Sequence, residues 1–338
     1  MFSWVKFVVC SAGIIWCGYR LSYLGDIICE KTRITRTIMG FAILAIATST
    51  PEFITSAASI VVVNLPDFAA GDLFGSIILN LGIIAVLDLV EGKGPLLLRV
   101  HTKQILYAGW TIIFLSIAIF SMLVRIFTAF SLSFLGLGWE SFILLALLPI
   151  ALFSIFNVEK ATEGNKKQDI SAHSTEKIYG HITLKSALFK FLFYLFVIIV
   201  LGIWLSQVGK EIVEVMGWSE VLVGTFFLAV VTSFPEFIVS LSALRFDVNM
   251  AVGNILGSNF FDVMIIPLCD GLLRGKVFLS VVKVENLFTI VLAIILLGVV
   301  IVGLISRSKR CFLRLGWDAI AMILILLTGG YFLIFLIK

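Results

Sequence analysis

Long apolar stretches alternate with short polar segments along the whole chain. A helix rises by about 1.5 Å per residue, so roughly 20 apolar residues suffice to cross a hydrocarbon core of about 30 Å. The apolar runs are continuous rather than alternating with polar residues, which indicates helices and not the strands of a membrane barrel. The pattern predicts ten membrane-spanning helices, at 4–22, 37–63, 69–89, 104–124, 138–157, 184–207, 218–243, 250–270, 284–306 and 316–336.

The longest polar segment lies in the middle of the chain and separates five predicted helices from five. It is too short to fold as a domain. We therefore expect a first five-helix repeat over 1–158, a cytoplasmic linker loop over 159–183 and a second five-helix repeat over 184–338. Because five is an odd number, the second repeat enters the membrane from the opposite side, which makes the two repeats inverted. Inverted repeats are common in secondary transporters, whose binding site lies where the repeats meet at the bilayer midplane.

Composition agrees with this interpretation, since 60% of the 338 residues are hydrophobic and only 14% are charged. A soluble domain carries roughly 25% charged residues. Most of the 25 Lys and Arg residues fall in loops after odd-numbered helices, which predicts that these loops are cytoplasmic and that both termini are extracytoplasmic. We expect an all-α, multi-pass protein of the cytoplasmic (inner) membrane, surrounded by lipid, with no nucleic acid and no obligate protein partner.

Two motifs occur twice, once in each repeat. Thr48-Ser-Thr-Pro-Glu52 returns as Thr232-Ser-Phe-Pro-Glu236. The segment from Gly71 to Asn80, with the sequence GDLFGSIILN, returns as GNILGSNFFD, which ends at Asp262. A carboxylate at membrane depth is costly and indicates a functional site. A duplicated structural bundle would not need acids at equivalent positions, so we expect the two copies to build one site.

The first motif places oxygen donors around a helix break. Thr48 and Glu52 are four residues apart and share a helix face. Pro51 has no N–H group, so the carbonyl of Ala47 loses its helical partner. In hydrocarbon such a carbonyl needs another partner, and a cation can serve. The same argument applies around Pro235 in the second copy.

The second motif adds Ser76 and Asn80 in one copy and Ser258 and Asp262 in the other, each pair four residues apart. Carboxylate, hydroxyl, amide and carbonyl oxygens suit hard cations such as Ca²⁺ and Na⁺, and the absence of thiolate or imidazole argues against zinc, copper and iron. Three carboxylates could be balanced by three Na⁺ ions, or by one Ca²⁺ with one carboxylate protonated. We therefore expect protons to compete with the transported cation.

These motifs resemble those of the cation/Ca²⁺ exchanger superfamily, and most of all those of the prokaryotic Na⁺/Ca²⁺ exchangers, over the whole chain. The pattern of that family is Gly-Thr-Ser-x-Pro-Glu followed by Gly-Asn-x-x-Gly-Ser-Asn-x-x-Asn/Asp. The resemblance implies that spans one and six slide across the other eight during alternating access. It also implies twelve residues that bind the transported ions. The central Ca²⁺ ligands and their helpers would be Glu52, Glu236, Thr48, Thr232, Asn80 and Asp262. The flanking Na⁺ sites would use Ser49 with Ser76, Ser233 with Ser258, and the carbonyls of Ala45 and Ala229.

The chain departs from the family pattern at four positions. Ala47 and Val231 replace the motif glycine, Asp72 replaces an asparagine, and Ile77 replaces the asparagine that the second copy keeps as Asn259. The proline breaks are intact, so the ligands can still form. Asp72 and Ile77 leave the ion set and the stoichiometry open.

The leading interpretation is an antiporter that exchanges Na⁺ for Ca²⁺, with no cofactor and no enzymatic activity. A cation/proton exchanger, K⁺ co-transport and Mg²⁺ as substrate remain alternatives within the superfamily, although the four serines favour Na⁺. An intramembrane acid protease would need paired aspartates with a Gly-x-Gly-Asp element, whereas Gly71-Asp72 follows two alanines. A passive channel is a third possibility, and it predicts Ca²⁺ flux without a counter-ion gradient.

Overall fold

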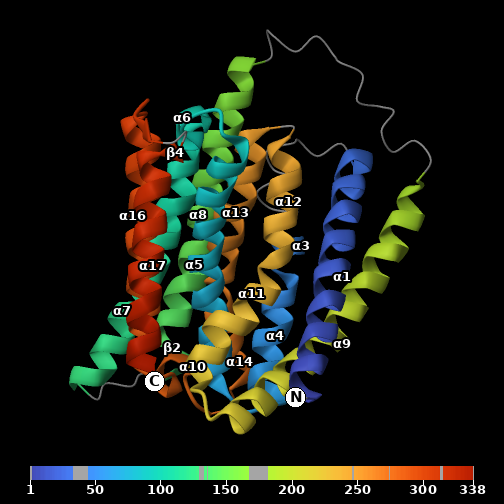
Figure 1. Ribbon diagram of the computed structural model, residues 1–338, viewed down its shortest axis with the longest axis vertical. Coiled ribbons are helices and arrows are strands. Elements are labelled where there is room, and N and C mark those ends of the chain that lie inside the picture. The colour runs from blue at the N-terminus through green and yellow to red at the C-terminus, as the bar shows by residue number, and fades with distance from the viewer. Residues whose placement is uncertain are drawn as a thin grey trace.

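The long helices stand side by side in one upright bundle in the computed structural model (Figure 1). The structure describes residues 2–32, 45–128, 133–134, 136–166, 182–245, 247–273, 275–312 and 315–337. Within these ranges, nine segments are long and apolar enough to span a membrane. The expected class, a mostly helical multi-pass membrane protein, is thus confirmed. The remaining predicted span, 37–63, lies partly outside the described residues, and its described part forms two short helices.

The helices follow the predicted order. In the first half they are α1 (Phe2–Thr32), α3 (Ala45–Thr48), α4 (Thr50–Val61), α5 (Pro66–Glu91), α6 (Leu96–Arg99), a 3₁₀ turn (Thr102–Gln104), α7 (Ile105–Thr128) and α8 (Trp139–Lys166). In the second half they are α9 (Leu184–Met216), α10 (Glu220–Val223), a π-helical turn (Gly224–Leu228), α11 (Ala229–Thr232), α12 (Phe234–Leu244), α13 (Val248–Asp262), α14 (Ile265–Leu272), α15 (Phe278–Val281), α16 (Asn286–Ser306) and α17 (Trp317–Ile337).

Three features differ from the sequence-based expectation. Two antiparallel hairpins of two-residue strands occur in this otherwise helical chain, β1 (Ser133–Phe134) with β2 (Leu137–Gly138) and β3 (Cys311–Phe312) with β4 (Leu315–Gly316). Helices α1 and α9 extend well beyond the apolar spans predicted for them. The predicted span 250–270 is interrupted after Asp262, ahead of Pro267, which removes a backbone donor. The span 218–243 is interrupted too, but at the break that Pro235 predicts.

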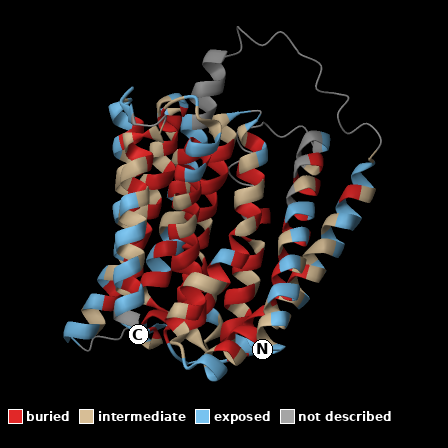
Figure 2. Cartoon of the chain, viewed as in Figure 1, coloured by how far each residue is buried: buried red, intermediate tan, exposed pale blue. Residues whose placement is uncertain are grey.

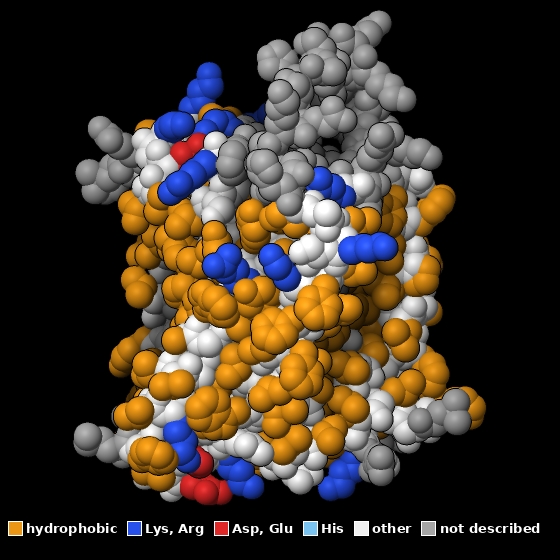
Figure 3. Space-filling model, turned by 90° about the vertical axis from the view of Figure 1, so that its right-hand side faces the viewer, with side chains coloured by type: hydrophobic (Ala, Val, Ile, Leu, Met, Phe, Trp, Pro, Cys, Tyr) orange, Lys and Arg blue, Asp and Glu red, His pale blue; other side chains and the backbone are white. Residues whose placement is uncertain are grey.

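Helices α5 and α13 form the centre of the bundle, where buried residues predominate (Figure 2). Helices α1 and α9 pack along each other at one side of the bundle (Figure 1) and contact the rest through α3, α4, α11 and α12. Hydrophobic side chains cover most of the face that they present, and acidic side chains are seen only near its two ends (Figure 3). An apolar belt between charged ends is the surface expected for a protein in a bilayer.

Two buried aspartates tie loops to the ends of this bundle. Asp88, at the end of α5, accepts hydrogen bonds from the backbone N–H of Leu96 at 2.8 Å and of Gly316 at 2.7 Å. Asp270, near the end of α14, accepts them from Phe278 at 2.5 Å and Gly138 at 2.8 Å. These aspartates occupy equivalent positions in the two halves, and each one joins a short helix to a hairpin.

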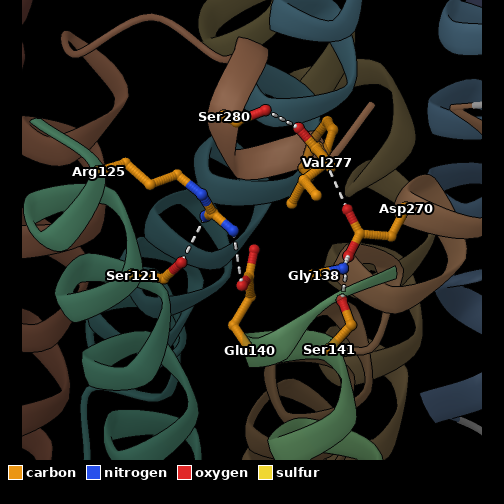
Figure 4. A network of polar contacts seen from close by, with 9 residues as sticks. Ser121, Arg125, Gly138, Glu140, Ser141, Asp270, Val277 and Ser280 are labelled. Atoms are coloured by element: carbon orange, nitrogen blue, oxygen red, sulfur yellow. Dashed lines mark hydrogen bonds and ion pairs between the residues drawn. The ribbon is translucent and has the colours of Figure 1, made fainter. Parts of the chain in front are cut away.

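The Asp270 contacts belong to a larger polar network at one end of the bundle (Figure 4). The hydroxyl of Ser141 donates to Asp270 at 2.5 Å. Next to it, Glu140 is fully buried and pairs with Arg125 at 2.9 Å, and Arg125 also donates to Ser121 at 2.5 Å. The network therefore connects α7, α8, β2 and α14 by charge and hydrogen bonding.

Candidate ion-binding site

Both copies of the first motif interrupt a helix at the serine that precedes the proline by two residues. Ser49 separates α3 from α4, and Ser233 separates α11 from α12. The prolines then sit in the first turn of the following helix, where a missing N–H group costs nothing. The predicted breaks are confirmed, and each one opens a helix N-terminus at the acidic residue of the motif.

Glu52 and Glu236 lie in the first turns of α4 and α12, and both are fully buried. A carboxylate is favoured there by the positive end of the helix dipole. The hydroxyl of Ser49 donates to Glu236 Oε1 at 3.4 Å, and the hydroxyl of Ser233 donates to Glu52 Oε1 at 3.4 Å. Each half thus supplies a hydroxyl that contacts the glutamate of the other half, and Ser258, of the same half as Glu236, also lies 3.5 Å from Glu236 Oε1. The second carboxylate oxygen, Oε2, has no hydrogen-bond partner in either residue.

The threonines repeat this crossed arrangement. Thr48 Oγ1 lies 3.2 Å from Ser258 Oγ on α13, and Thr232 Oγ1 lies 3.4 Å from Ser76 Oγ on α5. Each threonine hydroxyl also lies close to the carbonyl three residues earlier, Thr48 to that of Ala45 at 3.1 Å and Thr232 to that of Ala229 at 3.3 Å. Two clusters of hydroxyl and carbonyl oxygens therefore flank the glutamates, one built around each threonine.

The amide of Asn80 and the carboxylate of Asp262 complete the set. Asn80 Nδ2 donates to Asn259 Oδ1 at 3.0 Å, which leaves Asn80 Oδ1 without a partner. Both carboxylate oxygens of Asp262 are buried without a partner. Helix α13 ends at Asp262 and α14 begins at Ile265. This break follows from Pro267, which cannot donate to the carbonyl of Val263.

All twelve predicted ligands are among the described residues and are buried. Hydrogen bonds join eight of them into the four crossed pairs given above, and the carbonyls of Ala45 and Ala229 contact the threonine of their own half. Asn80 bonds only Asn259, and Asp262 has no hydrogen-bond partner among the described residues. Among the described residues, no group of three or more His, Cys, Asp or Glu could hold a metal ion on its own. A cation here would need the hydroxyl, amide and carbonyl oxygens as well as the carboxylates.

Two further polar residues join the predicted set. Asp72 on α5 accepts a hydrogen bond from Thr232 Oγ1 at 2.8 Å, and Asn259 is the partner of Asn80. The sequence offered a signal for both, since each lies in the second motif at one of the positions where the two copies differ. Their partners could not be predicted, because these contacts form where the two halves pack together. The spacing of residues within one motif does not say which residues of the other half lie nearby.

Comparison with known proteins places this arrangement in a family. A sequence model described as sodium/calcium exchanger protein matches residues 2–158 and 186–337. The uncharacterized membrane protein MJ0091 of Methanocaldococcus jannaschii is 25% identical over 240 residues, which cover 70% of each chain.

Two solved exchangers share the fold. One is the sodium-calcium exchanger NCX_Mj, with a TM-score of 0.59, 20% identity and coverage of 98% of both chains. The other is the H⁺/Ca²⁺ exchanger CAX, with a TM-score of 0.64, 13% identity and coverage of 98% of this chain and 89% of that one. Because the family model covers nearly the whole chain, this protein belongs to the sodium/calcium exchanger family of membrane transporters.

Proposed function

We propose that this protein is an antiporter of the cytoplasmic membrane that exchanges Na⁺ for Ca²⁺ at the site between its two halves. One observation carries the proposal. Glu52, Glu236 and Asp262 are buried, and each keeps at least one carboxylate oxygen that no group in the described part of the chain satisfies. An unpaired charge in a low-dielectric interior is strongly destabilising. A bound cation, coordinated also by the nearby hydroxyls and carbonyls, removes that cost.

The two kinds of oxygen suggest a division of roles. Ca²⁺ favours several carboxylate oxygens, so Glu52 and Glu236 would bind it, with help from Thr48 and Thr232. The two flanking clusters contain neutral oxygens, which suit a monovalent ion. They would bind Na⁺ through Ser76 and Ser258, through Ser49 and Ser233, and through the carbonyls of Ala45 and Ala229. Asn80 and Asp262 would complete the central position between the clusters.

The exchange cycle would follow from the inverted repeat. Hairpin β1–β2 lies at one end of the bundle and its counterpart β3–β4 at the other (Figure 1), as expected if the halves have opposite orientations. Helices α1 and α9 are equivalent and lie together outside the central bundle, so they would move against it to expose the site to each side in turn.

The test is radioactive Ca²⁺ uptake into proteoliposomes loaded with Na⁺ and diluted into Na⁺-free, K⁺ or acid-jump buffers. We expect uptake only under an outward Na⁺ gradient. Uptake driven by a proton gradient would instead support the proton-coupled alternative, and uptake without any counter-ion gradient would support a channel. Glu52→Gln or Glu236→Gln should abolish exchange, because each removes a charged ligand.

A matched control is Glu211→Gln. Glu211 lies on α9 away from the site and forms a partly exposed ion pair with Lys6, and such pairs contribute little. This variant should transport at a near-normal rate. If Glu52→Gln or Glu236→Gln also kept near-normal transport, the assignment of the site would be wrong.

A further inference from the structure

Besides Glu52, Glu236 and Asp262, a fourth carboxylate lies next to the proposed Na⁺ ligands, and the proposed function gives it no role. Asp72 is fully buried in the second turn of α5, which begins at Pro66. Its Oδ1 accepts the hydrogen bond from Thr232 at 2.8 Å, and its Oδ2 has no partner. Ser56 on α4 lies within reach of this carboxylate, yet its hydroxyl completes no hydrogen bond either. A single hydroxyl donor does not compensate a charged carboxylate in the interior.

The equivalent position in the other half is neutral, although its side-chain oxygen Oδ1 is also buried without a partner. Asn254 occupies it, and its amide donates to the hydroxyl of Ser240 at 3.1 Å. Ser240 is the counterpart of Ser56. No ion pair among the described residues involves Asp72. The two halves therefore differ by one negative charge at this position, and nothing described in the protein balances it.

The backbone next to Asp72 is packed against an unusual segment. A Cβ on Gly71 would approach the Cα of Gly224 to 2.9 Å, and one on Gly75 would approach the carbonyl oxygen of Thr225 to 2.8 Å. Gly224 and Thr225 begin the π-helical turn that leads into α11, and such turns are frequent at functional sites. The hydroxyl of Thr225 is also buried without a partner. The turn against which Gly71 and Gly75 pack therefore carries a further unsatisfied hydroxyl.

We propose that Asp72 extends the flanking cluster around Thr232 into a binding site for a monovalent cation, with Ser56 as an additional ligand. The proposal rests on the proposed function for the roles of Thr232 and Ser76. The donor set contains one carboxylate together with hydroxyl oxygens, whose single charge matches Na⁺ or K⁺, whereas Ca²⁺ favours several carboxylates. The cluster around Thr232 would then bind its ion more tightly than the neutral cluster around Thr48.

The test measures cation binding without transport. The midpoint of thermal unfolding of the purified protein is followed while NaCl or KCl replaces choline chloride at constant ionic strength, because a ligand that binds the folded state raises this midpoint. For Asp72→Asn we expect the concentration of the stabilising cation at half effect to rise about tenfold, as on loss of a group supporting a metal site. The half-effect concentration of Ca²⁺, measured alongside, should change less than twofold.

Ser56→Ala should shift the monovalent titration in the same direction by a smaller factor, whereas its counterpart Ser240→Ala should leave it unchanged. Asparagine already occupies the equivalent position 254, so Asp72→Asn introduces no larger side chain and should fold. An unchanged titration in Asp72→Asn, equal shifts for Ca²⁺ and the monovalent ion, or no stabilisation of the wild type by either salt would overturn the proposal. Ca²⁺ uptake driven by protons alone would contradict the proposed Na⁺ coupling. The shift of the thermal midpoint by NaCl or KCl, and its weakening in Asp72→Asn, would still be measurable, so the two proposals can fail separately.

Discussion

At the scale of single residues, Asn259 positions Asn80. The family resemblance named Asn80 as an ion ligand but gave no role to Asn259. Asn259 accepts the hydrogen bond from Asn80 Nδ2, and this bond fixes Asn80 with its oxygen unpartnered. Asn259→Ala removes the acceptor and lets the Asn80 amide rotate away from the ion. We expect the Ca²⁺ concentration for half-maximal uptake to rise about tenfold, as for other residues that orient a metal ligand, with a smaller change in maximal rate.

The matched control is Ile77→Ala, at the equivalent buried position in the first half. It also removes buried volume, which should cost about 2–5 kcal/mol of stability, but it removes no polar contact. We expect it to lower the thermal midpoint and to leave the half-saturating Ca²⁺ concentration unchanged. Equal effects of both variants on Ca²⁺ would mean that Asn259 acts only through packing.

At the scale of helices, the close contact between α1 and the start of α12 should control exchange. A Cβ on Gly18 would lie 2.4 Å from the ring carbon Cγ of Pro235, so any side chain there pushes α1 away from the helix break. Gly25, on the same helix, has no neighbour closer than 3.9 Å. We therefore expect Gly18→Ala to slow Ca²⁺ exchange several-fold, roughly what about 1 kcal/mol of strain produces, and Gly25→Ala to have no effect. Equal rates for the two variants would show that this contact does not limit the motion.

The helix breaks also show which elements could be predicted. Pro51 and Pro235 predicted their breaks because a proline removes a known backbone donor. The break after Asp262 has the same cause in Pro267, but that residue lies within a continuous apolar stretch and outside both motifs, so the helix was predicted to continue. The lengths of α1 and α9 were underestimated for a different reason. Their polar ends, such as 208–216, extend the helices beyond the apolar spans by which they were predicted.

At the scale of the whole molecule, Asp88 and Asp270 should stabilise the assembly of the two halves rather than bind ions. The sequence pattern did not reveal this role, because the backbone N–H groups of Gly316 and Gly138 come from distant parts of the chain. Asp270 accepts hydrogen bonds from three donors through two oxygens, whereas asparagine has only one side-chain oxygen that can accept. A lost hydrogen bond to a charged group costs about 1.5–3 kcal/mol of stability. The variant tested is Asp270→Asn. We expect a lower thermal midpoint and an unchanged half-saturating Ca²⁺ concentration. Asp88→Asn should behave alike, whereas Asp247→Asn, on an exposed helix cap, should have little effect.

The proposed inverted repeat also predicts a topology that one cysteine can test. Cys311 in hairpin β3–β4 is exposed, whereas Cys10, Cys17 and Cys269 are buried. The hairpin lies at the end of the bundle opposite to the start of α1 and the end of α17 (Figure 1). The distribution of Lys and Arg predicts that this loop is cytoplasmic. With Cys29 replaced by serine, a membrane-impermeant maleimide should label Cys311 in inside-out vesicles and not in right-side-out ones.

Replacing Cys311 by serine as well should abolish the labelling, which controls for reaction at the buried cysteines. Labelling in right-side-out vesicles alone would reverse the orientation and place both termini in the cytoplasm. It would leave the ion site unchanged, since that site lies between the halves and has the same crossed contacts viewed from either side. Labelling from both sides in separate vesicle preparations would mean that the chain inserts in two orientations. The charge difference between its loops would then be too small to fix the topology.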